Sequence, residues 1–228
     1  MIHMCNICKT YDTGAVALDN VNIDIAKGEF VFIVGASGAG KSTFIKMLFR
    51  EELPTSGKLL VNGHDVINMD RKEVPYLRRG LGVIFQDYRL LPDKTVFENV
   101  AFAMQVIEAP RRIMQRSVNA VLDVVGLRDK YRSFPSQLSG GEQQRVAIAR
   151  AIVNDPAIVI ADEPTGNLDP ETSWEIMDIF QRINKAGTTI VMATHDRNIV
   201  DAMKKRVIAI EDGRIVRDQL RGGYGYEA

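Results

Sequence analysis

A glycine-rich stretch from Gly35 to Thr43, with the sequence GASGAGKST, has the residue types and spacing of a phosphate-binding loop. It follows the apolar run Phe30–Val34, typical of a buried strand, and precedes apolar residues at helical spacing. The glycines let the backbone approach a phosphate closely, and the N–H groups at the helix start attract the anion. Lys41 is placed to reach the outer phosphates, and the Ser42 hydroxyl to ligate Mg²⁺. A glycine-rich turn with an incidental lysine is the alternative. The loop alone indicates only a nucleoside triphosphate, because kinases, GTPases and motor ATPases share it.

Two adjacent carboxylates, Asp162 and Glu163, close a second apolar run at 158–161. A carboxylate at a strand end near a phosphate loop can hold the Mg²⁺ shell, directly or through water. The neighbouring carboxylate is then placed to orient, and to deprotonate, an attacking water. A solvated acidic pair is the alternative, but two acids directly after a buried strand are not typical of surface patterning.

Four polar features each follow a predicted strand: the phosphate loop, Gln86, the Asp162–Glu163 pair and His195. In a sheet of parallel strands joined by helices, ligands bind at the carboxyl ends of the strands. We therefore expect these features to converge on one nucleotide, which is a stronger argument than any single motif.

The stretch from Leu138 to Arg145, with the sequence LSGGEQQR, is the most specific in the chain. Ser139 and two glycines precede a predicted helix, and this arrangement makes a second helix N-terminus that can bind an anion. The chain carries no second nucleotide signature. The second loop is therefore expected to cap the nucleotide of another copy.

Composition limits the class of protein. The 228 residues are 46% hydrophobic and 25% charged, and their formal net charge is zero, so there is no basic footprint for nucleic acid. No apolar run approaches the roughly 18 residues of a membrane-spanning helix, and the N-terminus shows no signal segment. We expect a cytosolic protein whose membrane attachment, if any, comes through a partner.

Cys5 and Cys8 have the C-x-x-C spacing of redox and metal sites. Both lie in a predicted opening strand, where positions 5 and 8 face opposite ways. His3 is a conceivable third metal ligand, but a fourth is lacking. Two plain buried or half-buried thiols are the expected outcome.

Hydrophobic patterning divides the chain into three parts. It opens with half-buried strands at 2–9 and 21–25, and residues 88–155 form a mostly helical insert that Asp155-Pro156 ends. The α/β alternation then resumes, with strands at 158–161 and 188–193, a helix starting at Asp169-Pro170, and a closing hairpin at 207–216. The tail at 221–228 is expected to be mobile.

With these motifs in this order, the chain resembles the ABC-type ATPases over essentially its whole length. The resemblance implies an α/β fold: a P-loop NTPase core of mainly parallel sheet with helices, an N-terminal antiparallel β subdomain and a helical insert. It implies one domain, 1–228, in which 1–87 and 156–228 form the core with the β subdomain, and 88–155 form the insert that carries the signature motif.

The resemblance also implies roles for individual residues. The ATP-binding set is Tyr11, Gly35, Ser37, Gly38, Ala39, Gly40, Lys41, Ser42 and Thr43. The catalytic set is Glu163, His195 and Gln86, and the Mg²⁺ ligands are Ser42, Gln86 and Asp162. Tyr11 matches the aromatic residue that stacks on adenine, although a strand-end tyrosine packed on the core is an adequate alternative.

The resemblance implies that two copies of the chain form a head-to-tail homodimer that sandwiches two ATP molecules. In this chain, the resemblance implies that each site combines the phosphate loop of one copy with Ser139, Gly140 and Gly141 of the other. Asp169 would communicate between the two copies. All the elements needed for hydrolysis to ADP and phosphate are present.

The stretch EPTGNLD at 163–169 resembles a branch of the family that includes lipoprotein-release, macrolide-efflux and cell-division ATPases, and within that branch FQDYRLL at 85–91 is similar to the cell-division members. That similarity implies an FtsX-type integral membrane partner, other division proteins, and a place on the cytoplasmic face of the plasma membrane at the division site. The docking candidates are Tyr88, Leu90, Leu91, Val96 and Phe97, which could equally form the core of the insert.

Other functions are open or disfavoured. A lipoprotein-release or drug- or peptide-export transporter remains the alternative, because the partner carries that difference. A soluble ABC ATPase of DNA repair or translation is disfavoured, because such proteins generally need a long coiled-coil insert or two tandem ATPase domains, and these 228 residues contain neither. A phosphotransferase that shares only the phosphate loop is disfavoured by the 138–144 stretch and His195.

Overall fold

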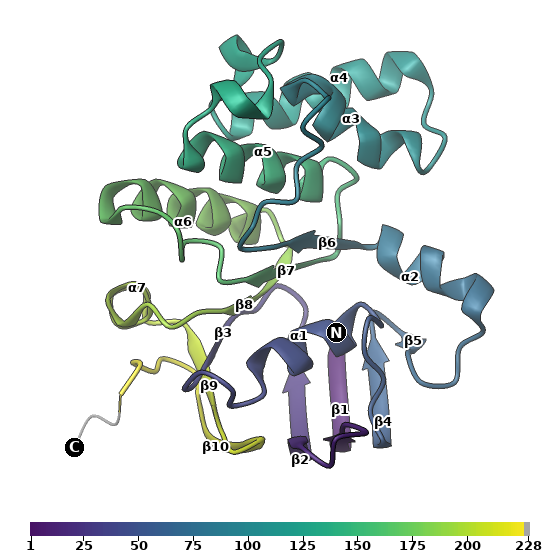
Figure 1. The fold of residues 1–228 in the computed structure, drawn as a ribbon, viewed down its shortest axis with the longest axis vertical. Helices are drawn as coiled ribbons and strands as arrows, with labels where there is room; N and C mark the ends of the chain where they lie inside the picture. Colours follow the sequence, from purple (N-terminus) through teal and green to yellow (C-terminus); the bar gives the residue numbers. More distant parts are fainter. Residues whose placement is uncertain (226–228) are drawn as a thin grey trace.

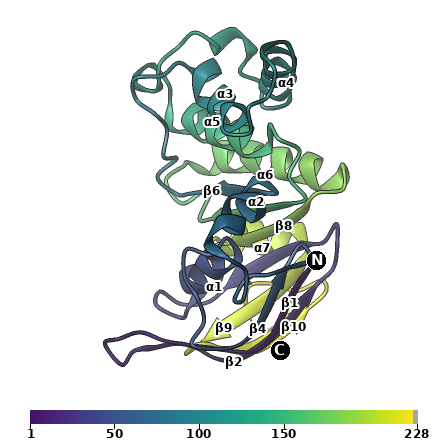
Figure 2. The ribbon, with the colours of Figure 1, turned by 90° about the vertical axis from the view of Figure 1, so that its right-hand side faces the viewer.

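The computed structural model describes residues 1–225, and their strands form two sheets (Figures 1 and 2). The larger sheet has the strand order β10-β9-β3-β8-β7-β6, and the smaller one has the order β2-β1-β4-β5. The strands are β1 (Ile2–Thr10), β2 (Val16–Ile25), β3 (Phe30–Val34), β4 (Ser56–Val61), β5 (His64–Asp65), β6 (Leu81–Ile84), β7 (Ile158–Asp162), β8 (Thr189–Ala193), β9 (Arg206–Glu211) and β10 (Arg214–Gln219).

The larger sheet is parallel from β9 through β3, β8 and β7 to β6, and β10 pairs antiparallel at its edge. Its central strands are apolar throughout because both faces of the sheet are covered. In β3, Phe32 and Val34 pack into one hydrophobic cluster, whereas Val31 and Ile33 pack into the other. Because side chains alternate between the two faces of a strand, β3 packs on helices with one face and toward the small sheet with the other.

Helices connect the strands and cover the sheet. The α-helices are α1 (Lys41–Leu48), α2 (Val74–Arg79), α3 (Val96–Gln105), α4 (Arg111–Val124), α5 (Gly140–Ile152), α6 (Pro170–Lys185) and α7 (Arg197–Met203). Short 3₁₀ helices lie at Arg71–Glu73, Arg128–Lys130 and Pro135–Gln137. In Figure 1, α3, α4 and α5 gather at one end of the molecule, and α6 lies between them and the larger sheet.

The helix α1 joins the phosphate loop to the core between the two sheets. Its residues Phe44, Ile45 and Leu48 are buried with residues of β1 and β2 on one side and of β7 and β8 on the other. Burying an aromatic or aliphatic side chain of this size contributes about 1.5–3 kcal/mol relative to exposure. The start of α1, and with it the phosphate loop, is therefore fixed by the packing of the whole core.

Two short helices, α2 and α7, are absent from the sequence-based expectations. Each spans two turns or fewer, too short for a clear hydrophobic periodicity. The start of α7 does carry a local signal, because the Asp196 carboxylate accepts a hydrogen bond from the N–H of Ile199 at 3.1 Å. None of the described helices is both long and apolar enough to cross a membrane.

The opening strand β1 is irregular, and this affects the cysteines. Its pairing register shifts between Met4 and Ile7, and Asn6 has a φ of 50°. The sequence-based prediction assumed that side chains alternate regularly along this strand, and the irregularity breaks that alternation between Cys5 and Cys8. Cys5 is exposed, Cys8 is half-buried, and both are free thiols.

Candidate functional site

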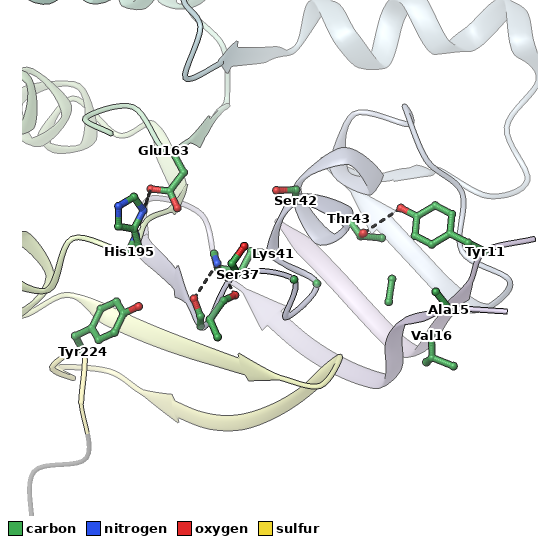
Figure 3. A pocket seen from close by; sticks show the side chains of 15 residues that line it. Tyr11, Ala15, Val16, Ser37, Lys41, Ser42, Thr43, Glu163, His195 and Tyr224 are labelled. Atoms are coloured by element: carbon green, nitrogen blue, oxygen red, sulfur yellow. Dashed lines mark hydrogen bonds and ion pairs between the residues drawn. The ribbon is translucent and has the colours of Figure 1, made fainter. Parts of the chain in front are cut away.

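The phosphate loop connects β3 to α1 and lines a cavity of about 720 Å³ (Figure 3). Residues from five separate segments line this cavity: Tyr11, Ala15, Val16, Ala17, Gly35, Ala36, Ser37, Gly38, Gly40, Lys41, Ser42, Thr43, Glu163, His195 and Tyr224. The structure thus brings most of the predicted nucleotide residues together at the carboxyl ends of β3, β7 and β8, as the sequence-based argument expects.

Close backbone contacts explain two of the loop glycines. Gly35 has a φ of 150°, and a Cβ added there would lie 2.2 Å from the carbonyl oxygen of Ile210. Gly40 has a φ of 109°, and a Cβ there would lie 2.3 Å from the carbonyl oxygen of Ala17. Both positions combine a left-handed backbone with no room for a side chain, so only glycine fits.

The Lys41 side chain curls back over its own loop. Its Nζ donates hydrogen bonds to the carbonyl oxygens of Gly35 at 2.8 Å and Ala36 at 2.9 Å. An ammonium group held at the centre of a loop of N–H donors makes an anion site, because both kinds of donor favour negative charge.

Tyr11 lies at the end of the cavity opposite His195 (Figure 3). Its hydroxyl lies 3.0 Å from the Thr43 Oγ1, and the Lys9 ammonium lies 4.8 Å from the centre of its ring. Ala15, Val16 and Ala17 complete this wall. Sequence reasoning missed these three residues. The one available signal is their place at the start of β2, which pairs with β1, the strand that ends just before Tyr11.

Glu163 and His195 form a pair on the opposite wall. The His195 Nδ1 lies 2.8 Å from the Glu163 Oε2, and the backbone N–H of His195 donates to the same oxygen at 3.2 Å. Glu163 has a φ of 51°, an unusual conformation for a residue other than glycine, and its N–H donates to the Ala193 carbonyl at 2.9 Å. Backbone strain of this kind concentrates at functional sites.

Asp162 ends β7 beneath the phosphate loop. Burial raises the pKa of its carboxyl, and the neighbouring Glu163 carboxylate raises it further. Lys41, Lys46 and a hydrogen bond with Ser42 act in the opposite direction on the same pKa. Two close, half-buried carboxylates repel each other and favour a bound cation.

Three residues predicted for the nucleotide site, Asp162, Ala39 and Gln86, do not line the cavity within the described part of the chain. Ala39 belongs to the phosphate loop, but its side chain is buried in the hydrophobic core. Gln86, in the loop after β6, is exposed, and its side-chain nitrogen lies 3.5 Å from the Asn167 Oδ1. Asn167 also donates to the Gln86 carbonyl at 3.2 Å, so these two loops hold each other.

The signature residues lie apart from this cavity, at the start of α5 near the far end of the molecule (Figure 1). Ser139 caps α5: its hydroxyl accepts from the Glu142 N–H at 3.2 Å, and the Glu142 carboxylate accepts from the Ser139 N–H at 2.9 Å. A Cβ on Gly141 would lie 2.3 Å from the Thr172 Cγ2, so α5 packs tightly on α6.

Asp169 caps the neighbouring helix. Its carboxylate accepts from the Thr172 N–H at 3.0 Å; a side-chain hydrogen bond with Thr172, and then this backbone bond, lower the pKa of Asp169. Ser139, Gly140, Gly141 and Asp169 thus share one surface region of the chain, where α5 meets α6, and do not touch the phosphate loop of the same chain.

A second cavity of about 570 Å³ forms a groove between the α2–β6 region and the helices α3 and α5. We call it the arginine groove, because Arg78, Arg79, Arg89 and Arg150 surround an apolar floor that includes Phe85, Leu91, Phe102, Val106 and Ile107. The Arg89 guanidinium lies 3.6 Å from the centre of the Phe85 ring, and Arg150 donates to the carbonyls of Tyr88 and Arg89.

One of the predicted docking residues lines the arginine groove, and others belong to the hydrophobic core. Leu91 lines the arginine groove. Val96 is fully buried, and Leu90 and Phe97 pack against the main hydrophobic cluster. Phe102, Val106 and Ile107 come from the end of α3 and were missed, because nothing in a helical pattern distinguishes an unpartnered face from a packed one.

Comparisons with known proteins agree with this geometry. A sequence profile of the ABC transporter family matches residues 18–166. The cell division ATP-binding protein FtsE of Bacillus subtilis is 60% identical over 225 residues, covering 99% of each chain. FtsE of Escherichia coli is 47% identical over 227 residues, covering 100% of both chains.

Solved structures give the same picture. The ATP-binding cassette MJ0796, solved as a dimer in a post-hydrolysis state bound to ADP and Pi, superposes with a TM-score of 0.87. It is 36% identical in sequence, and the match covers 98% of this chain and 100% of that one. The predicted fold class and the predicted similarity to cell-division ATPases are both confirmed. The chain belongs to the ABC transporter family, as one of its ATP-binding ATPase cassettes.

Proposed function

We propose that this chain hydrolyses ATP as the ATPase subunit of an FtsE/FtsX-like membrane complex, and that it converts the ATP cycle into a conformational signal for cell division and cell-wall hydrolase activation. The single observation that carries the hydrolytic part is the Glu163–His195 pair on the wall of the phosphate-loop cavity. The cell-division part rests on full-length similarity to proteins named as cell division ATP-binding proteins.

ATP would lie along the cavity, with its base beside Tyr11 and its phosphates in the glycine loop. Phosphate oxygens are better acceptors for the Lys41 ammonium than the two carbonyls it now bonds, because they carry charge. The ring of Tyr11 is half-buried and borders the open side of the cavity, which suits stacking on a base.

Ser42 and Asp162 fit a magnesium ion, and Gln86 would be its third protein ligand. All three offer hard oxygen donors, and the Asp162 carboxyl, with a pKa raised by burial and by Glu163, lies within hydrogen-bond reach of the Ser42 hydroxyl. When bound, the ion supplies positive charge to the phosphates.

Glu163 would hold the attacking water and accept its proton. The carboxylate can do so because His195 fixes one of its oxygens through two contacts and leaves the other for water. Most of the rate enhancement in such reactions comes from positioning and charge stabilisation. The strained backbone at Glu163 serves the same end, since it directs the side chain into the cavity.

The full site would be shared between two copies of the chain. Ser139, Gly140 and Gly141 lie remote from their own phosphate loop, so they can reach a nucleotide only in another copy. The N-terminus of α5 would then present N–H groups to the terminal phosphate. Asp169, beside them at the start of α6, would contact the other copy. The phosphate loop would then belong to a core with the β subdomain (1–87 and 156–228), and the Ser139–Gly141 stretch to an insert (88–155).

The arginine groove is the proposed docking site for the membrane partner. Four arginines around an apolar floor suit a short amphipathic segment that carries acidic residues, such as one from the cytoplasmic side of an FtsX-type protein. The chain would be held at the cytoplasmic face of the plasma membrane by that partner, at the division site. A lipoprotein-release or export permease would use the same chemistry.

Release of phosphate from MgATP by the purified chain tests the enzymatic part. A steady-state rate that requires both Mg²⁺ and ATP supports it, and transfer of the phosphate to an added acceptor instead would contradict it. Purification of the tagged chain from its native cells in mild detergent tests the partner. A stoichiometric FtsX-type protein supports the cell-division role, and a lipoprotein-release or export permease would move the function to transport.

Reversal of charge in the groove tests the docking site. Arg79→Glu should abolish co-purification of the membrane partner while leaving phosphate release by the isolated chain unchanged, because Arg79 lies outside the nucleotide cavity. Arg112→Glu on the exposed start of α4 is the matched control and should retain the partner. Retention of the partner by both variants would place docking elsewhere.

A further inference from the structure

The segment that follows β10 reaches the nucleotide cavity through Tyr224. Tyr224 lines the same wall as Glu163 and His195, opposite Tyr11, and Figure 3 shows its hydroxyl turned toward the phosphate loop. We propose that Tyr224 donates a hydrogen bond to the terminal phosphate of the bound nucleotide, so that the C-terminal tail forms part of the site. This inference rests on the proposed function, because it needs ATP in the cavity.

Residues 222–224 pack against the fold, contrary to the expectation of a mobile tail at 221–228. Gly222 and Gly223 are buried, and the N–H of Gly222 donates to the Lys205 carbonyl at 3.1 Å. A Cβ on Gly222 would lie 3.0 Å from the Cβ of Val207 and 3.1 Å from that of Gln219. The glycines therefore let the tail turn back closely over β9 and β10. Residues 226–228 of that expectation lie outside the described residues.

Three side chains hold the backbone and ring of Tyr224. The Asp201 carboxylate accepts from its N–H at 2.6 Å, and the Arg217 guanidinium donates to its carbonyl at 2.7 Å. The Arg197 guanidinium lies 5.1 Å from the centre of its ring. These are two charge-assisted bonds and one cation–π contact, which together fix the direction of the side chain.

The anchoring residues connect the tail to the His195 loop. Arg197 and Asp201 belong to α7, the helix that begins two residues after His195. Tyr224 and His195 therefore approach the cavity from one rigid unit, at the same end of the phosphate loop. Tyr11 lies at the other end beside the proposed base position, so a hydroxyl at the Tyr224 end faces the phosphate farthest from the base.

A tyrosine hydroxyl suits this position chemically. A hydroxyl is a neutral hydrogen-bond donor, so it adds no negative charge to a triphosphate site. A hydrogen bond to a charged oxygen is worth about tenfold or more in affinity. The contact would be made by ATP and lost in ADP, since only ATP has the third phosphate.

Calorimetric titration of the full chain with ADP and with the non-hydrolysable triphosphate AMPPNP, both with Mg²⁺, tests the contact. Tyr224→Phe keeps the ring and removes the hydroxyl. We expect about tenfold weaker AMPPNP binding and ADP binding within about twofold of the unmodified chain. Leu220→Ala, on the exposed part of the same tail, is the matched control and should change neither affinity.

A second variant tests the role of the tail as a whole. Gly222→Val places a branched side chain against Val207 and Gln219, and should reproduce the selective loss of triphosphate affinity by displacing Tyr224. Unchanged AMPPNP affinity in Tyr224→Phe, or equal weakening for AMPPNP and ADP, would overturn the contact. Absence of binding of either nucleotide to the unmodified chain would instead overturn the proposed function itself, and the contact with it.

Discussion

The Nδ1 of His195 lies 2.8 Å from the Glu163 Oε2, on the wall of the phosphate-loop cavity. The same oxygen also accepts the backbone N–H of His195, so two donors from one residue hold one carboxylate oxygen. In the proposed mechanism the second oxygen holds the attacking water, and the first prediction tests that role.

Glu163→Gln should bind ATP with nearly unchanged affinity but hydrolyse it about 10²–10⁴-fold more slowly, because an amide cannot accept the proton of the attacking water. Steady-state phosphate release and nucleotide titration on the same preparation separate the two effects. Glu108→Gln, an exposed carboxylate between α3 and α4, is the control and should keep the normal rate. Normal turnover by Glu163→Gln would remove Glu163 from the mechanism.

Lys41→Ala should weaken ATP binding by about 10- to 100-fold. The ammonium bonds two carbonyls of its own loop, and the variant loses a charge-assisted bond to phosphate worth about 1.5–3 kcal/mol. Equilibrium binding of a fluorescent ATP analogue measures the change. Lys58→Ala on the exposed strand β4 controls for the loss of one positive charge. Equal affinity in the two variants would contradict the loop assignment.

Ser139→Arg should leave ATP binding by the single chain intact and abolish hydrolysis, because a long cationic side chain at the start of α5 would prevent closure on a second copy. The substitution also removes a helix cap worth about 0.5–2 kcal/mol. Thr95→Arg is therefore the matched control, since Thr95 caps α3 with the same reciprocal bonds to Glu98. ATP-dependent dimerisation by light scattering and phosphate release are the measurements. Hydrolysis that survives in Ser139→Arg would refute the shared site.

The cap of α5 should also make stability pH-dependent. A hydrogen bond from the Ser139 N–H, assisted by Lys130 and Arg145, lowers the pKa of Glu142 below its unfolded value. A carboxyl with a lowered folded-state pKa stabilises the fold above the unfolded pKa, and this contribution is lost as the pH falls through the folded pKa.

Glu142→Gln should therefore lower the free energy of unfolding by about 0.5–1 kcal/mol near neutral pH and flatten its decline in acid. Urea unfolding at several values between about pH 6 and about pH 3 measures both effects. Glu211→Gln, exposed at the end of β9, provides the control. An acid limb as steep in Glu142→Gln as in the unmodified chain would show that the cap carries no titrating contribution.

Sequence patterns identified the loop and strand ends that the structure brings to the cavity, because each is made by contiguous residues. The buried strand β3, the glycine loop and α1 follow one another within 30–48, so their hydrophobic spacing and glycines identify the phosphate loop from contiguous residues. The acidic pair at the end of β7 and His195 after β8 are likewise read from strand ends. The sequence also predicts that the 138–145 stretch lies apart from its own phosphate loop, because it forms a second anion-binding helix start without a second nucleotide signature.

Only the tertiary structure placed Tyr224 in the cavity, because it arrives there through the docking of the tail on β9 and α7, a contact between segments with no shared periodicity. The same holds for the arginine groove, whose four arginines come from α2, the loop after β6 and α5. Sequence determines which residues a loop or helix contains. Which loops and helices meet is decided by strand order, and by the two-sided burial of the parallel sheet.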